Sequence, residues 1–275
     1  MSPSSLPVVR AGLLFVDIDG TLVGPDGVHA RVWPAFERLR AAGWGIGLCT
    51  GRPGSGEALA LARRADPDGL HIFESGASVM RADGEVVASA LLPTELLAAI
   101  VALGDAHGAT VEAYTAAGRF LARERDELIA RHEVLLGAGA ELVPALDRLS
   151  GLVRIQWVVT HAAWPALRAA AKAGLGDVDV HEGRSPKMPD VVFAAVTARG
   201  VSKAWGIRRA AEHFGVPLAR AAMVGDALND VSAFRIVGRT YATADGVPGA
   251  QAEAQRLVPG PADGGVADAV ADLLG

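Results

Sequence analysis

Three short apolar segments, each running straight into a polar or glycine-containing turn, limit the fold of this chain more than any other feature. They cover residues 13–16, 46–49 and 222–224. Alternation of such segments with helical patterns is typical of a parallel sheet joined by right-handed crossovers. The sequence therefore predicts an α/β fold with a doubly wound parallel sheet. The intervening helical patterns lie at residues 33–42, 57–64 and 203–214.

The middle of the chain has a different pattern, in which strand-like segments surround helical ones. Stretches rich in turn residues mark both of its limits, which is typical of a boundary between two folding units. We predict an inserted α+β unit at residues 84–189 and a main unit formed by residues 1–83 and 190–275. Within the insert, the strand-like segments are 111–114, 153–160 and 178–181, and the helical ones are 94–107, 124–136 and 164–173.

Composition excludes several classes of protein. The 26 basic and 31 acidic residues give a net charge of −5, and no run of basic residues exceeds two, so nothing indicates a nucleic-acid partner. The single cysteine, Cys49, excludes a disulfide within the chain and fits a reducing compartment. The N-terminus has no basic region of the kind that opens a signal peptide, its apolar run stops at Asp17, and no segment is long enough for a membrane span. We expect a cytoplasmic protein that binds no membrane.

Two carboxylates, Asp17 and Asp19, follow the first apolar segment and are followed by Gly20 and Thr21. Ligands of doubly wound sheets bind beyond the carboxyl ends of the strands. Two carboxylates this close repel each other unless a cation or a shared proton relieves them, and Mg²⁺ prefers oxygen ligands. The pattern predicts a Mg²⁺ site at this strand end. The alternative is that these are ordinary turn residues after a strand.

Groups suited to an anion occur at two further places. Thr50 and Gly51 follow the second apolar segment and offer a hydroxyl and a backbone amide just before a helix. Lys203 stands at the start of a helix, where the helix dipole disfavours a cation unless that cation serves a bound anion. A helix cap and a solvated surface lysine are the respective alternatives.

The third apolar segment ends in a cluster of polar residues. Asp226 follows it directly, and Asn229 and Asp230 lie on the next turn. One metal ligand with supporting groups behind it would account for three such side chains. A helix cap at Asn229 or Asp230 is the alternative.

Taken together and in this order, these elements resemble the haloacid dehalogenase (HAD) superfamily of phosphohydrolases. Residues 17–21 match its first motif, Thr50 its second, Lys203 its third and residues 225–230 its fourth. The long interval between Thr50 and Lys203 is similar to the Cof-type branch, whose C2 cap is inserted there. The resemblance implies a Rossmann-like HAD core with an α+β cap that acts as a substrate lid. Ser75 departs from the Asn-Gly-Ala pattern of that branch.

The resemblance also implies roles for individual residues. Asp17 would be the nucleophile that forms an aspartyl-phosphate, and Asp19 the general acid and base. Mg²⁺ would be bound by Asp17, the backbone carbonyl of Asp19 and Asp226. The groups expected to bind phosphoryl oxygens are Thr50, Gly51, Lys203 and Asn229.

Further residues are expected to support the site or to select the substrate. Asp230 would hold Lys203 or a metal-bound water, and Arg52 would be either a further anion contact or a structural ion pair. Polar side chains of the insert are candidates for substrate recognition, namely Arg154, Glu182, Arg184 and Lys187.

The expected function is that of a Mg²⁺-dependent phosphohydrolase, a monomer or homodimer acting on a small phosphorylated metabolite such as a sugar, polyol or glycosyl-glycerate phosphate. Two alternatives remain. The first is a phosphomannomutase-like phosphotransferase, which would pass the phosphoryl group to a sugar. The second is a non-catalytic nucleotide-binding α/β protein, although the chain has none of the usual glycine-rich nucleotide motifs.

Overall fold

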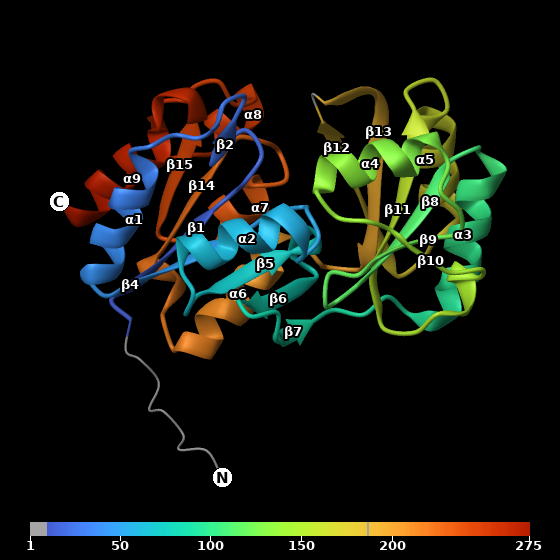
Figure 1. Ribbon diagram of the computed structural model, residues 1–275, viewed down its shortest axis with the longest axis horizontal. Coiled ribbons are helices and arrows are strands. Elements are labelled where there is room, and N and C mark those ends of the chain that lie inside the picture. Colours follow the sequence, from blue (N-terminus) through green and yellow to red (C-terminus); the bar gives the residue numbers. More distant parts are fainter. Residues whose placement is uncertain (1–9, 186) are drawn as a thin grey trace, which may run out of the picture.

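The computed structural model describes residues 10–185 and 187–275, which form two units that lie side by side (Figure 1). The first unit is built on a five-stranded sheet with the strand order β16-β15-β14-β1-β4, in which every neighbouring pair is parallel. The strands are β1 (Gly12–Val16), β4 (Trp44–Leu48), β14 (Ala221–Gly225), β15 (Arg239–Thr243) and β16 (Arg256–Val258).

Helices cover both faces of this sheet, because successive side chains of β1 point to opposite sides. Leu14 and Val16 belong to one core cluster, together with residues of α1, α2 and α9, whereas Leu13 and Phe15 belong to another, with residues of α6 and α7. The doubly wound α/β fold is thereby confirmed. The helices are α1 (Val32–Ala41), α2 (Gly56–Ala65), α6 (Lys203–Phe214), α7 (Val231–Phe234), α8 (Pro248–Gln251) and α9 (Gly265–Leu274).

Two small antiparallel sheets complete the first unit. One has three strands in the order β5-β6-β7, and the other is the hairpin β2-β3. Cys49 forms a parallel bridge with Ile72, which brings β5 beside the end of β4. The strands are β2 (Val23–Gly24), β3 (Gly27–Val28), β5 (Leu70–Phe73), β6 (Ser78–Arg81) and β7 (Val86–Ser89).

The second unit is built on a mixed six-stranded sheet with the order β10-β9-β8-β11-β13-β12. Ile155 and Trp157 of β11 pack in one cluster with α3 and α5, while Val158 packs in another with Leu128 and Leu135 of α4. The elements are α3 (Leu97–Ala106), β8 (Thr110–Thr115), β9 (Phe120–Ala122), α4 (Glu127–Leu136), β10 (Glu141–Leu142), β11 (Leu152–Thr160), α5 (Trp164–Gly174), β12 (Val178–Ser185) and β13 (Met188–Ala198).

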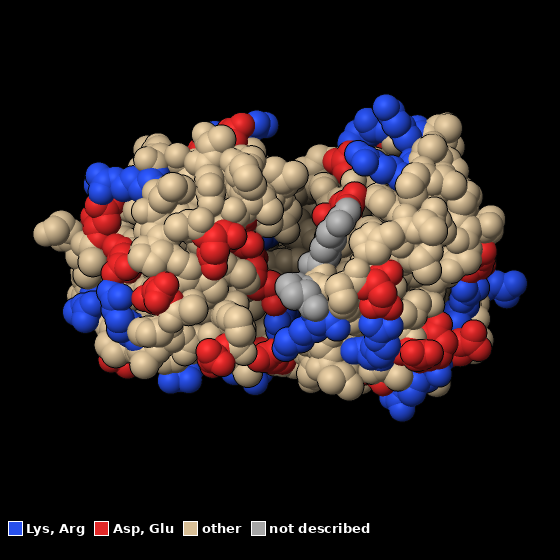
Figure 2. All heavy atoms as spheres, turned by 90° about the horizontal axis from the view of Figure 1, so that it is seen from above, with Lys and Arg blue, Asp and Glu red and all other residues tan. Residues whose placement is uncertain are grey.

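The surface is hollowed between the two units, and acidic side chains lie on the rim that the first unit contributes (Figure 2). Near the expected limits of the insert, β7 pairs with β6 of the first unit, and β13 continues the second sheet as far as Ala198. The division at residues 84 and 189 itself stays a prediction. Within the described residues, no helix has both the length and the apolar character needed to cross a bilayer.

Candidate active site

The carboxyl ends of β1, β4 and β14 meet at one edge of the sheet, because these three strands are parallel neighbours. Asp17 directly follows β1, and its backbone N–H donates to the carbonyl of Val224 at 3.0 Å. Asp226 directly follows β14, and Thr50 lies two residues beyond β4. Segments far apart in the sequence thus place polar groups at the edge where ligands of such sheets bind.

Lys203, the first residue of α6, points into this edge and is buried, with 1% of its side chain exposed. Its Nζ lies 2.7 Å from Oδ1 of Asp17 and 2.6 Å from Oδ1 of Asp230. Burial lowers the pKa of Lys203, but the charges of Asp17 and Asp230 outweigh that effect and hold the pKa above its usual value. Lys203 is therefore a buried ammonium that binds two carboxylates.

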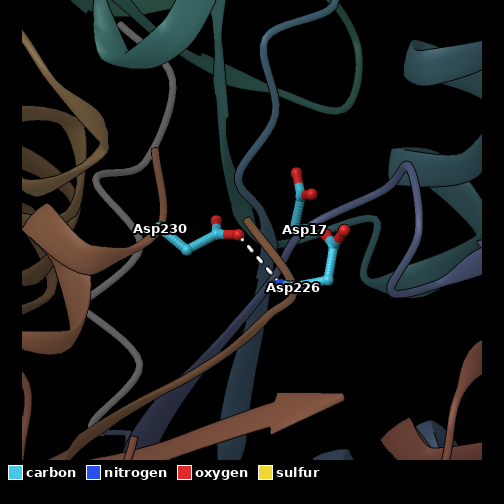
Figure 3. A group of neighbouring side chains, drawn as sticks. All are labelled: Asp17, Asp226 and Asp230. Atoms are coloured by element: carbon cyan, nitrogen blue, oxygen red, sulfur yellow. Dashed lines mark hydrogen bonds between the residues drawn. The ribbon is translucent and has the colours of Figure 1, made fainter. Parts of the chain in front are cut away.

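Three carboxylates gather around this lysine. Oxygen atoms of Asp17, Asp226 and Asp230 lie within 4.8 Å of one another. Figure 3 shows the side chains of Asp17 and Asp226 beside each other, with Asp230 reaching towards the backbone nitrogen of Asp226. Burial raises the pKa of Asp17, and burial together with the charge of Asp230 raises the pKa of Asp226 to about 6. The site therefore holds more negative charge than one lysine balances.

The hydrogen-bond donors around each carboxylate indicate what that carboxylate does in the cluster. Asp230 uses Oδ1 for Lys203, and its Oδ2 accepts from the backbone N–H groups of Asp226 and Ala227 at 3.0 Å each. Asp230 thus supports the loop and the lysine. Asp226 accepts a hydrogen bond from Oγ1 of Thr21 at 3.0 Å. Asp17 and Asp226 are the carboxylates whose oxygens best fit a hard divalent cation.

Gly20 is required for this arrangement. Its φ of +83° lies in the left-handed region, and a Cβ atom there would come within 2.5 Å of Oδ2 of Asp226. Any larger residue would push the Asp226 carboxylate away from Asp17.

The loop after β4 lies beside the carboxylates. Thr50 is buried, and its Oγ1 accepts from the N–H of Arg52 at 3.1 Å. The guanidinium of Arg52 binds the carboxylate of Asp19 twice and that of Glu57 once, at 2.7 Å. Of the two roles left open for Arg52, the ion pair is the contact that the structure contains. The side chain of Asp19 is therefore turned towards Arg52 and lies outside the carboxylate cluster.

Comparison with known proteins identifies the family. A family model described as a haloacid dehalogenase-like hydrolase matches residues 12–238. This chain belongs to the HAD-like hydrolases. It is 31% identical over 265 residues to a phosphoglycolate phosphatase from Halorubrum lacusprofundi, an alignment that covers 94% of this chain and 96% of the relative. The predicted family and the predicted class of enzyme, a phosphatase, are thereby confirmed.

Solved structures of HAD proteins share the whole fold. A haloacid dehalogenase-like hydrolase from Bacteroides thetaiotaomicron aligns with a TM-score of 0.82 at 18% identity, over 95% of this chain and 99% of that one. The HAD subclass IIB sugar phosphatase BT4131 aligns with a TM-score of 0.78 at 21% identity, over 95% and 98%. HAD-like hydrolases generally use a divalent metal, and the carboxylate cluster could bind one.

The remaining predicted site residues of this HAD-like hydrolase are not members of the carboxylate cluster. Asn229 is exposed on the turn before α7, and Lys187 is exposed beside the turn that joins β12 to β13. Arg184 lies on β12, and its side chain is outside the part of the chain that the structure describes. Glu182 accepts from Nε1 of Trp164 at 2.8 Å.

Arg154 differs from the other candidates of the insert because it is buried. Its guanidinium contacts the first unit at Glu74 and at the carbonyl of Gly51. Sequence analysis did not single out Glu74 or Glu57 as parts of the site. Neither glutamate belongs to a sequence motif. Each becomes recognisable only in the folded chain, where Glu74 pairs with Arg154 and Glu57 pairs with Arg52.

Proposed function

We propose that this protein is a Mg²⁺-dependent phosphohydrolase that removes phosphate from a small phosphorylated metabolite through an aspartyl-phosphate intermediate. The observation that carries the proposal is the position of Lys203, whose Nζ bridges Asp17 and Asp230 next to Asp226. A buried ammonium beside one carboxylate nucleophile is suited to a phosphoryl group, whose charge develops on its peripheral oxygens.

In the proposed first step, a carboxylate oxygen of Asp17 attacks phosphorus, and Asp19 gives its proton to the leaving oxygen. In the second step, Asp19 takes a proton from water as that water attacks phosphorus, which frees Asp17 and releases inorganic phosphate. Thr50, Gly51 and Lys203 would hold the phosphoryl oxygens throughout, with Asn229 as a further contact. Arg52 holds the Asp19 carboxylate next to the site between the proton transfers, and the side chain, 56% exposed, has room to turn from there to the leaving oxygen.

Asp17, Asp226 and the backbone carbonyl of Asp19 would hold Mg²⁺. When bound, the ion would neutralise charge on the phosphoryl group and orient it. Burial raises the pKa of Asp17, and the charges of Asp230 and Asp226 raise it further, so a cation bound between Asp17 and Asp226 would relieve this crowding of negative charge.

The substrate class is proposed as a sugar, polyol or glycosyl-glycerate phosphate, and the name of the Halorubrum relative adds phosphoglycolate as a compound to test. Residues 84–189 would form the cap over the site, with Arg184 and Lys187 as candidates for contact with the leaving group. We place the enzyme in the cytoplasm as a monomer or homodimer that binds neither nucleic acid nor membranes.

A phosphate-release screen over these esters tests the proposal. We expect steady turnover of at least one ester, loss of that turnover with EDTA and recovery with Mg²⁺. Release that depends on a sugar bisphosphate activator would indicate the phosphotransferase instead. Metal-independent turnover would contradict the proposed cofactor, and a protein that turns over no ester would favour the non-catalytic nucleotide-binding alternative.

A further inference from the structure

The second unit rests on the segment that follows β4, residues 51–57. The backbone of Gly118, in the turn between β8 and β9, is so close to Gly54 that a Cβ atom on Gly118 would come within 2.6 Å of the carbonyl carbon of Gly54. At the end of α4, a Cβ atom on Gly56 would come within 2.8 Å of the carbonyl oxygen of Gly137. The inserted unit therefore packs on the loop beside the candidate active site, and residues 51–57 are called its seat below.

Arg154 of β11 is the charged residue at this seat. Its side chain is 3% exposed and lies over the ring of Tyr114, 4.0 Å from the ring centroid. One Nη donates to the carbonyl of Gly51, and the other lies 2.9 Å from Oε2 of Glu74. The planar guanidinium can make these two contacts at once, which the single ammonium of a lysine could not reproduce in the same geometry.

Glu74 depends on Arg154 for compensation of its charge. It is fully buried, and its charged form is stabilised by the guanidinium of Arg154, 2.9 Å from Oε2, and by a backbone hydrogen bond from Gly54. Burial raises the pKa of Glu74 to about 7, and the charge of Arg154 opposes that shift. Glu74 and Ser75 also have φ values of +54° and +60°, an unfavourable conformation for residues with a side chain.

The strained turn at residues 74–75 and the side chain of Arg154 together bind the carbonyl groups of three successive loop residues, 50 to 52. The N–H of Ser75 donates to the carbonyl of Thr50, and the N–H of Glu74 donates to that of Arg52, at 3.1 Å each. Arg154 holds the carbonyl between them, that of Gly51. Because a peptide group is planar, a fixed Gly51 carbonyl also fixes the N–H of Arg52. That N–H donates to Oγ1 of Thr50, so it sets the direction of the threonine hydroxyl.

We propose that Arg154 is a positioning residue for phosphate binding, which couples the seating of the inserted unit to the orientation of the Thr50 hydroxyl. Arg154 acts through the peptide between Gly51 and Arg52 and touches no reacting atom. When the inserted unit lifts from its seat, Arg154 leaves with it and the loop loses its central contact. The inference rests on the proposed function, in which Thr50 binds a phosphoryl oxygen.

Two variants of this arginine test the proposal. Arg154→Lys keeps a positive charge near Glu74, whereas Arg154→Met removes it. We expect both variants to raise the inhibition constant of inorganic phosphate about tenfold and to lower kcat/KM about tenfold. A change of this size corresponds to the loss of one well-placed hydrogen bond. We also expect amide hydrogen exchange in residues 50–57 to become about tenfold faster in both, measured without substrate.

Stability and positioning are separated by a double variant. Arg154→Met alone leaves Glu74 buried and unpaired, so its melting temperature should fall. Glu74→Gln combined with Arg154→Met removes both charges, so the melting temperature should recover while phosphate inhibition stays weak. A purely structural role for the pair predicts that phosphate inhibition recovers as well, and that result would overturn the proposal.

The matched control is Arg123→Met, which removes an arginine of the same unit from an exposed ion pair with Asp105. It should leave phosphate inhibition and exchange in residues 50–57 as in the wild type. Inhibition constants within twofold of the wild type in both Arg154 variants would overturn the proposal. A wild type that hydrolyses no ester contradicts the proposed function instead, and unchanged exchange in residues 50–57 would then still overturn the role of Arg154.

Discussion

The guanidinium of Arg52 holds the carboxylate of Asp19 at two points, with Nε 2.8 Å from Oδ2 and Nη2 2.6 Å from Oδ1. Arg52 is anchored on its other side by Glu57, at 2.7 Å, and only 9% of its side chain is exposed. The proposed acid and base is therefore oriented by a residue of the loop after β4, the loop on which the inserted unit rests.

Loss of this orientation should slow catalysis more than it affects folding. We expect Arg52→Met to lower kcat about 10²-fold, since a well-placed general acid contributes about 10²–10⁴-fold. The free energy of unfolding should change by about 1 kcal/mol or less, because both carboxylate partners are at least half exposed. Arg235→Met, which breaks an exposed pair with Glu253, is the control. A kcat for Arg52→Met within twofold of the wild type would show that Arg52 does not orient Asp19 for catalysis.

Replacement of the proposed nucleophile should abolish turnover. Asp17→Asn removes the attacking oxygen, and Lys203 retains Asp230 as its partner. We expect kcat to fall at least about 10³-fold with the circular dichroism spectrum unchanged. Acid-quenched wild type should yield a peptide phosphorylated at Asp17, and the exposed-site variant Asp26→Asn should behave as the wild type. Turnover of Asp17→Asn at the wild-type rate would rule out this nucleophile.

The carboxylate cluster should make the folded protein more stable when Mg²⁺ is present. The ion relieves repulsion between Asp17 and Asp226 and binds the folded chain, so at a concentration about 100 times its Kd it should add about 2.7 kcal/mol to the free energy of unfolding. In Asp226→Asn that gain should be largely lost. Thermal melts with and without Mg²⁺ measure both effects, and an equal gain in the two proteins would place the ion elsewhere.

The turn at Gly76 should tolerate no side chain. Its φ is +109°, and a Cβ atom would come 2.0 Å from the carbonyl oxygen of Ser202, next to Lys203. Gly84 is a matched control, because its φ is +102° and a Cβ atom there meets nothing within 4 Å. We expect Gly84→Ala to cost about 1–2 kcal/mol of stability and Gly76→Ala at least about 2 kcal/mol more. Equal costs, measured by urea denaturation, would show that the backbone at Gly76 can move.

Acid should destabilise the protein through His71. This side chain is fully buried; Nδ1 accepts from the N–H of Leu48, and Nε2 donates to the carbonyl of Asp66. Burial lowers its pKa from 6.5 to about 4. Because the unfolded chain takes up the proton first, stability present above pH 6.5 is lost as the pH falls towards 4, by about 3 kcal/mol. His71→Gln should reduce this slope, and urea melts at about pH 7 and about pH 4.5 would detect it.

The sequence predicted the parallel sheet and its polar edge because both depend on short-range patterns. A buried strand appears in the sequence as a continuous apolar run, and parallel neighbours bring their ends together, which is how Asp17 and Asp226 came to be expected in one place. Lys203 was expected there because a cation at the start of a helix suits a bound anion and because of the resemblance to the HAD superfamily. Strand β13 was not predicted, since Pro189 and Asp190 lie inside it and are turn residues in most contexts.

Contacts between the units could not be predicted in the same way. Arg154 and Glu74 are ordinary charged residues in the sequence, and their pairing follows from how the second sheet docks on the first unit. The same applies to Arg52, whose ion pair with Asp19 depends on the course of the loop after β4. Which charged residues pair with one another depends on tertiary packing, and it cannot be derived from their spacing in the sequence.

The backbone contact between Gly54 and Gly118 leaves no room for even a methyl group. Residues of increasing size at position 118 would therefore act as wedges that prop the inserted unit open by graded amounts. Such a series would make the depth of the entrance adjustable, and because Arg154 would lift away with the unit, phosphate binding should weaken step by step as residue 118 grows.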